Sequence, residues 1–202
     1  MKLRYSPSSP YVRKVMLTAL ETGQGDAITL EATNAWAPET DLPKDNPLSK
    51  VPALVLGSGE ALYDSPVICE YLDSLHAGPK LFPAAGPDRW TALRRQALAD
   101  GLLDAALLVR VETMMRPGEL LWQTWLERQQ AAVRRSLDVM EAEADSLGDT
   151  LSSIGEIAFA AALGYLDFRD IVGDWRPGRP RLTAWFGLVS QRDSMVRTAP
   201  KG

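Results

Sequence analysis

The chain begins with alternating polar and apolar residues and then changes to helical spacing. Residues 2–5 alternate with a period of two, which predicts a strand. From Val12 to Leu20, apolar residues recur at positions i, i+3, i+4, i+7 and i+8, which predicts an amphipathic helix. We expect this helix to start at Ser9-Pro10 and to end before Gly23, because serine and proline favour helix starts and glycine favours helix ends.

Further strands and a second helix follow. Residues 27–33 are expected to form a strand, and an irregular stretch with three prolines comes next. Residues 51–56 and 60–63 flank a Gly-Ser-Gly turn and predict a hairpin. Asp64-Ser65-Pro66 then supplies a carboxylate, a hydroxyl and a proline at a helix start. Residues 1–76 therefore predict a compact α/β domain.

The second half of the chain changes character. Residues 77–87 are rich in proline and glycine, as linkers between domains are. Residues 88–202 show helical periodicity without strand-like alternation and predict an all-helical domain. Two long helices are expected, over residues 88–116 and 119–145. A serine followed three residues later by a glutamate, Ser153–Glu156, has the spacing of a capping box that begins another helix.

Composition excludes several classes of protein. The 202 residues include 22 basic and 26 acidic ones, for a net charge of −4, so the chain lacks the basic footprint of nucleic-acid-binding proteins. One cysteine, Cys69, permits no internal disulfide, and one histidine, His76, cannot assemble a zinc cluster. The longest uncharged apolar stretch, residues 157–166, has only about half the length of a bilayer-spanning helix. We expect a cytoplasmic protein without metal, nucleic-acid partner or membrane association.

Three motifs occur in an order and spacing that resemble a known family. They are Ser9-Pro10-Tyr11-Val12-Arg13-Lys14-Val15, Asn46-Pro47-Leu48-Ser49-Lys50-Val51-Pro52-Ala53-Leu54 and Asp64-Ser65-Pro66-Val67-Ile68-Cys69-Glu70-Tyr71-Leu72. With the helical second half, the chain resembles a cytosolic glutathione S-transferase of the bacterial, serine-type group. The resemblance covers nearly the whole chain and implies a thioredoxin-like N-terminal domain followed by an all-helical C-terminal domain. Gly155-Glu156 departs from the Ala-Asp pair that is frequent in the family.

The resemblance assigns the central chemistry to Ser9. Only the thiolate of glutathione attacks, and a cysteine-type thiol has a pKa near ~8.5. Lowering that pKa by about 2 units requires about 2.7 kcal/mol. A hydroxyl hydrogen bond to a charged group contributes ~1.5 to 3 kcal/mol, and a helix N-terminus ~0.3 to 2 kcal/mol. The resemblance implies that Ser9 donates to the sulfur while staying protonated; from the residues alone, simple helix capping by Ser9 is favoured, and Ser8 is a second candidate.

The same resemblance assigns the binding of glutathione. Val51 and Pro52 match the family's cis-proline element, in which the backbone of the residue before the proline pairs with the cysteinyl part of glutathione. Lys50 is a candidate for neutralising the glycyl carboxylate, with a solvated surface lysine as the alternative. Asp64 and Ser65 match the pair that binds the γ-glutamyl group, in which the hydroxyl and the helix N–H groups bind its carboxylate and the acid faces its ammonium. Plain N-capping is compatible with that assignment.

Other reactive side chains receive structural interpretations. Cys69 falls inside a helix beside the apolar stripe, which is typical of a buried structural thiol. Arg13 and Lys14 are expected to form a solvated helix face, and His76 to interact with the C-terminus of its helix. A motif for dithiol exchange would need two cysteines near Pro10, and this chain has none there.

The pocket for the second substrate is less specified by the sequence. In the family it is formed by the middle of the first two helices of the second domain. The candidates are Asp100, Asp104, Arg110, Met114 and Trp122. Methionine and tryptophan at helical spacing are more often core residues, so no role is assigned to them. The resemblance also leaves open that Asp100 reaches the glutathione of a partner subunit.

Together these observations predict a homodimeric transferase that activates glutathione and joins its sulfur to small hydrophobic electrophiles, as in detoxification. Two alternatives remain open from the sequence. One is a glutathione-dependent isomerase, dehalogenase or peroxidase on the same scaffold. The other is an interaction protein that has kept the scaffold without catalysis.

Overall fold

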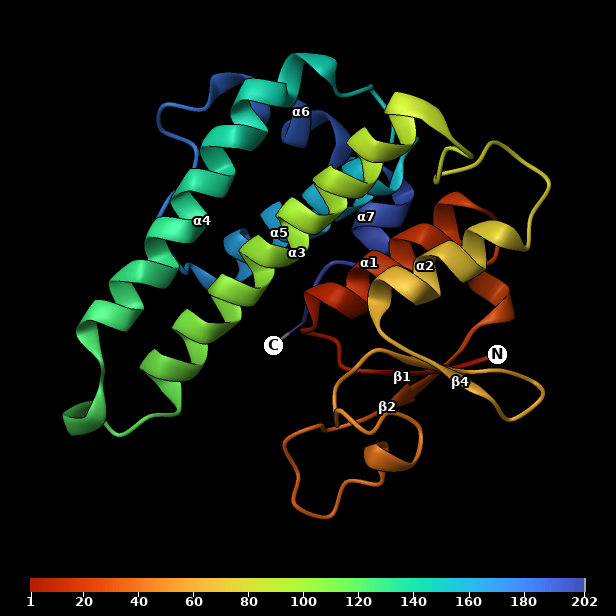
Figure 1. Ribbon diagram of the computed structural model, residues 1–202, viewed down its shortest axis with the longest axis horizontal. Coiled ribbons are helices and arrows are strands. Elements are labelled where there is room, and N and C mark those ends of the chain that lie inside the picture. The colour runs from red at the N-terminus through yellow and green to blue at the C-terminus, as the bar shows by residue number, and fades with distance from the viewer. Residues whose placement is uncertain (202) are drawn as a thin grey trace.

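The N-terminal part of the chain is an α/β domain built on one sheet (Figure 1). The computed structural model describes residues 1–201. In chain order the elements are β1 (Lys2–Tyr5), α1 (Pro10–Glu21), the 3₁₀ turn η1 (Gly25–Ala27), β2 (Thr29–Ala32), the 3₁₀ turn η2 (Leu42–Lys44), β3 (Ala53–Val55), β4 (Ala61–Leu62) and α2 (Ser65–Ser74). The strand order is β2-β1-β3-β4, with β1 parallel to β2 and β3 antiparallel to both β1 and β4.

The sheet and its two helices share one core. Leu3 of β1 lies opposite Leu54 of β3, and both side chains are fully buried. Helices α1 and α2 lie together on one side of the sheet, with α3 beside them (Figure 1). The apolar stripes of α1 and α2 face this core, as the helical spacing predicts, with Val15 on α1 and Ile68 and Leu72 on α2.

The first strand has the predicted bounds, and the other three are present but shorter than expected. β2 begins at Thr29 because residues 25–27 form a 3₁₀ turn. β3 begins only after Pro52, which has no N–H to donate to a ladder. The predicted hairpin of β3 and β4 is confirmed.

The rest of the described chain is helical, as predicted. Its elements are α3 (Gly86–Met114), the 3₁₀ turn η3 (Gly118–Leu120), α4 (Gln123–Glu143), the 3₁₀ turn η4 (Ala144–Ser146), α5 (Ile154–Arg169), α6 (Pro180–Val189) and α7 (Asp193–Arg197). α3 and α4 lie side by side, and α5 packs against both α3 and α1 (Figure 1). Every residue from Ile154 to Leu166 is buried, so α5 is the centre of the helical core.

The capping box at the start of α5 is confirmed. The Ser153 Oγ accepts the Glu156 N–H at 3.3 Å, and the Glu156 carboxylate accepts the Ser153 N–H at 2.9 Å. The other carboxylate oxygen accepts the Gly148 N–H at 2.9 Å, which ties the preceding loop to the helix. A buried carboxylate is therefore held by several N–H donors at the positive end of α5.

No helix within residues 1–201 combines the length and the hydropathy that a bilayer-spanning segment requires.

Candidate functional site

The N-terminal ends of α1 and α2 lie next to each other and face the middle of α3. Figure 1 shows both helices running away from α3 in the same general direction. Lys14 of α1 is ion-paired with Asp100 of α3, which fixes the two elements against one another. Because helix N-termini carry partial positive charge and unpaired N–H groups, this arrangement places two anion-binding poles at one place.

Ser9 is the N-cap of α1. Its Oγ accepts the Val12 N–H at 3.3 Å, while its own N–H donates to the carbonyl of Ser6 at 3.1 Å. Among the described residues, the Ser9 hydroxyl has no acceptor for its hydrogen. A hydroxyl that accepts from a helix N–H is oriented by the helix and can still donate outward.

Ser8 lies in the turn before the cap. Its Oγ is 3.4 Å from the Ser6 Oγ, and both Ser8 and Ser9 are half-buried. The structure therefore brings both candidate hydroxyls to the start of α1, but only that of Ser9 caps the helix.

Asp64 and Ser65 stand at the start of α2. Asp64 is the N-cap residue, yet its exposed carboxylate makes no capping hydrogen bond and no ion pair within residues 1–201. Ser65 is only 1% exposed and begins the first turn. The capping interpretation of the Asp64 side chain is therefore wrong, and its carboxylate stays open at the helix N-terminus.

The loop before β3 is held by a buried asparagine. The Asn46 Nδ2 donates to the Lys50 carbonyl at 2.8 Å, and the Asn46 Oδ1 accepts the Leu48 N–H at 3.0 Å. The Val51-Pro52 peptide bond is cis, as the resemblance implied. Pro52 is buried, Val51 is half-buried and the Lys50 side chain is exposed.

Arg13 and Lys14 correct one sequence prediction. Both are buried, and Lys14 has no exposed surface, so they do not form a solvated face. The Lys14 Nζ lies 2.6 Å from both carboxylate oxygens of Asp100. The Arg13 guanidinium packs against Gly164 of α5 and donates to the Met195 carbonyl at 3.1 Å. Burial lowers the pKa of Arg13 to about 10.

Two carboxylates of α3 are therefore engaged within the chain. Asp100 is partnered by Lys14, and Asp104 accepts a hydrogen bond from the Tyr11 hydroxyl. Burial raises the pKa of Asp100 and the Lys14 charge lowers it, and burial is the larger effect, so the pKa of Asp100 is raised. Burial and the Asp104 hydrogen bond both raise the pKa of Tyr11, so this hydroxyl stays protonated beside Ser9.

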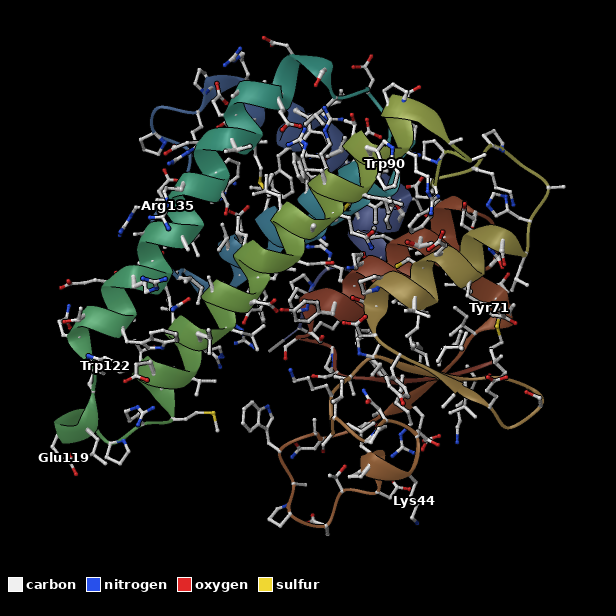
Figure 2. All side chains as sticks on the ribbon, in the orientation of Figure 1. Lys44, Tyr71, Trp90, Glu119, Trp122 and Arg135 are labelled. Atoms are coloured by element: carbon white, nitrogen blue, oxygen red, sulfur yellow. The ribbon has the colours of Figure 1, made fainter. Side chains whose placement is uncertain are left out.

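The remaining candidates from the sequence lie at the far end of α3 and in the segment that follows it, where the Trp122 N–H donates to Glu112 of α3 at 2.8 Å. Met114 is 67% exposed at the end of α3. Trp122 is exposed before α4 (Figure 2), with 63% of its surface accessible. It stacks on Trp125 with ring centroids 5.9 Å apart. Their interpretation as core residues is wrong. Arg110 lies further along α3 than Asp104 and near Arg169 of α5.

Cys69 and His76 take no part in this site. Cys69 is fully buried, and burial raises the pKa of its thiol to about 11, which keeps it protonated. His76 lies beyond the end of α2, with its Nε2 3.0 Å from the Asp73 carboxylate. No cluster of three or more histidine, cysteine, aspartate or glutamate side chains suited to a metal ion occurs among residues 1–201.

Comparison with known proteins decides the family. Residues 8–75 match the model described as "Glutathione S-transferase, N-terminal domain", and residues 123–187 match "Glutathione S-transferase, C-terminal domain". The chain is 37% identical over 205 residues to the uncharacterized GST-like protein YibF of Escherichia coli K12, covering 99% of this chain and 98% of that one. The chain belongs to the glutathione S-transferase family.

Solved structures of this family agree with the fold. A glutathione transferase family member from Pseudomonas fluorescens Pf-5 with bound glutathione is 45% identical, with a TM-score of 0.92, and the match covers 100% of this chain and 99% of that one. The same family member was also solved with S-(propanoic acid)-glutathione. A glutathione S-transferase from Methylobacillus flagellatus with bound glutathione is 34% identical, with a TM-score of 0.91 and 99% coverage of both chains. The thioredoxin-like domain with its four-stranded mixed sheet and the helical domain of the glutathione S-transferase fold are thereby confirmed.

Sequence reasoning missed several residues near this candidate site of the glutathione S-transferase family member. Asn46 was part of a recognised motif, but its side-chain contacts depend on the fold of the loop. Tyr165 and Arg169 of α5 approach α1 and α3 from far along the chain. Only the helical spacing of Tyr165 and Arg169, four residues apart, could have placed them on one face.

Proposed function

We propose that this family member transfers small hydrophobic electrophiles to the sulfur of glutathione, with Ser9 stabilising the thiolate. The observation that carries the proposal is the N-cap geometry of Ser9. Its Oγ is oriented by the Val12 N–H, and its hydroxyl hydrogen remains available for an acceptor at the positive end of a 12-residue helix. A sulfur anion at that place would accept this hydrogen bond and face the helix N-terminus.

The interactions available at the start of α1 supply enough free energy to lower the thiol pKa of glutathione. A thiol pKa that falls by about 2 units corresponds to about 2.7 kcal/mol. The Ser9 hydroxyl supplies ~1.5 to 3 kcal/mol of this as a hydrogen bond to a charged group, and the α1 terminus ~0.3 to 2 kcal/mol. The thiol proton leaves to solvent, and Ser9 stays neutral throughout. The thiolate then forms a bond to the electrophilic carbon, whose leaving group departs with its electron pair or whose double bond accepts a proton from water.

The rest of glutathione is assigned along the same edge of the domain. Val51 would pair through its backbone with the cysteinyl part, before the buried Pro52. The open carboxylate of Asp64 would face the γ-glutamyl ammonium, and the first turn of α2 at Ser65 would bind the γ-glutamyl carboxylate. Lys50 and Ser8 are proposed as further contacts. Support comes from the relatives from Pseudomonas fluorescens and Methylobacillus flagellatus, which were solved with glutathione.

The bound S-(propanoic acid)-glutathione of the Pseudomonas relative supports a site with room for a substituent on the sulfur. We further propose a homodimer, because apolar side chains such as Val67 of α2 and Leu108 of α3 are exposed. In our proposal Asp100 does not reach the partner's glutathione, since Lys14 already binds both of its oxygens. The cytoplasmic location, the lack of a metal and the domain limits at 1–76, 77–87 and 88–202 stay predictions from the sequence.

Two serine variants test the proposal. Ser9→Ala should still bind glutathione in calorimetry, while kcat/KM with a halo-nitroarene falls about 10- to 100-fold, as expected for the loss of ~1.5 to 3 kcal/mol. Ser8→Ala is the matched control and should change kcat/KM far less. An equal fall of kcat/KM in both variants would contradict the assignment of the thiolate to Ser9 alone. If wild-type protein binds no glutathione at millimolar concentration, the transferase proposal fails in favour of an interaction protein.

A further inference from the structure

Two arginines meet where α3 and α5 pack together beyond the start of α1. Arg169 is the last residue of α5, and Arg110 lies in the last two turns of α3. The two are close enough for repulsion between their charges to lower the pKa of Arg169, after the larger effect of burial. Both side chains are half-buried.

Neither arginine has an acidic partner. In the part of the chain that the structure describes, ten of the sixteen arginines form ion pairs with aspartate or glutamate, and Arg110 and Arg169 are among the six that form none. The Nε of Arg169 is buried without any hydrogen-bond acceptor among residues 1–201. Two half-buried arginines near each other without acidic partners raise each other's energy by charge repulsion. A bound anion would relieve this repulsion.

The arginine pair is linked to the thiolate site by two tyrosines. Tyr165 lies four residues before Arg169 on the same face of α5 and interacts with its guanidinium. Tyr165 also lies near Tyr11, which stands two residues after Ser9 and donates to Asp104. Tyr11 and Tyr165 therefore connect Ser9 with the two arginines in the region where α1, α3 and α5 meet.

The geometry of Arg169 suits a flat anionic group. Its Cζ lies 3.9 Å from the centroid of the Phe168 ring, so the aromatic ring supports the guanidinium plane. A guanidinium held in this way presents its N–H groups as a fork that matches the two oxygens of a carboxylate. The ring supplies apolar surface beside the charged group.

We propose that Arg110 and Arg169 bind an anionic group on the second substrate, so that the preferred electrophiles are small apolar molecules that end in a carboxylate. This inference rests on the proposed conjugation of glutathione at Ser9. It changes the expected substrate class from neutral hydrophobic electrophiles to amphipathic acids. In the reaction with a haloacid, the glutathione sulfur forms a bond to the carbon next to the carboxylate, the carbon–halogen bond breaks, and halide leaves with the electron pair.

Iodoacetate and iodoacetamide form a matched pair of probes, because they have similar size and differ by one negative charge. The enzymatic rate is measured for each after subtraction of the reaction with free glutathione. The ratio of the two kcat/KM values should fall about tenfold in Arg110→Gln and in Arg169→Gln, as expected for one charge-assisted hydrogen bond. Arg135→Gln is the control, because Arg135 is exposed on the outer side of α4 (Figure 2). This substitution removes the same charge and should leave the ratio of the two kcat/KM values unchanged.

A second readout uses binding alone. Wild-type protein should bind S-carboxymethylglutathione about tenfold more tightly than S-carbamidomethylglutathione in calorimetry, and rising sodium chloride should reduce the difference. The arginine variants should lose this preference while their affinity for glutathione itself is unchanged. Because either arginine can be replaced alone, Arg110→Gln tests the inference even if Arg169→Gln does not fold.

The outcomes separate this inference from the proposed function. If the wild-type protein fails to bind glutathione, the proposed function fails and the inference fails with it. If glutathione binds but the acid and the amide are used and bound equally, only the inference is overturned. A loss of glutathione affinity as large as the loss for the acid would also overturn it, because the arginines would then hold glutathione itself.

Discussion

Replacement of Lys14 by methionine tests how the two domains are joined. Lys14 has no exposed surface, and its Nζ lies 2.6 Å from both oxygens of Asp100 across the α1–α3 contact. Lys14→Met keeps the length of the side chain and removes the charge. Asp100 is then left half-buried without its counter-ion.

The expected loss of stability is large. Breaking a buried pair by removing one partner costs about 3–5 kcal/mol. Because the Asp100 side chain retains 19% exposure, we reduce this to about 2–4 kcal/mol. At about 2–4 °C per kcal/mol for a chain of this size, the melting temperature should fall by roughly 4–16 °C.

The loss should also depend on pH. Burial raises the folded-state pKa of Asp100, so this group favours the folded state at low pH and the advantage disappears as pH rises through that pKa. Lys14 lowers the pKa of Asp100, so removing Lys14 raises that pKa further. The difference between wild type and Lys14→Met should therefore grow from about pH 4 to about pH 7.

Urea unfolding at several pH values measures these effects. Adding Asp100→Asn to Lys14→Met should recover much of the lost stability, because no charge is then buried. Lys44→Met is the control at an exposed lysine in the N-terminal domain (Figure 2) and should change stability by less than about 0.5 kcal/mol. A loss that is the same at all pH values, or that the second substitution does not relieve, would refute the reasoning.

Three further outcomes are expected. Gly155→Ala should destabilise the protein by about 1–3 kcal/mol in urea unfolding, because the added Cβ would lie 2.7 Å from the Cβ of Arg95. Gly101→Ala, with open space around it, should stabilise the protein by about 0.5–1 kcal/mol. Equal effects of the two substitutions would contradict the packing around Gly155. Glu156→Gln should cost about 1–3 kcal/mol because an amide cannot accept all the N–H groups that face the carboxylate, and an unchanged unfolding midpoint would speak against the capping box. Cys69, with a pKa of about 11 and no exposure, should resist iodoacetamide in the folded protein at pH 8, as followed by mass spectrometry, and rapid labelling would show that the helix opens.

Local signals in the sequence accounted for the elements and for part of the site. The Ser9-Pro10 start, the Gly-rich hairpin and the Ser153–Glu156 box depend on neighbours a few residues apart, so their geometry could be predicted. The order of the three motifs then placed Val51-Pro52 and Asp64-Ser65 through the family resemblance.

Contacts between distant segments could not be predicted in the same way. The expectation of a solvated face for Arg13 and Lys14 assumed that α1 is buried on one side only. In the structure α1 packs against α2 and also against α5. Arg13 therefore lies against Gly164 of α5, and Lys14 pairs with Asp100 of α3, 86 positions away. Periodicity along one helix carries no information about such a second neighbour.

The most direct test of the central claim is the titration of bound glutathione by the ultraviolet absorbance of its thiolate. In the wild-type protein the thiolate should appear about 2 pH units below its position in free glutathione. In Ser9→Ala the titration should move back upward by about 1–2 units, while glutathione remains bound. An identical titration in the two proteins would contradict the assignment of the thiolate to Ser9.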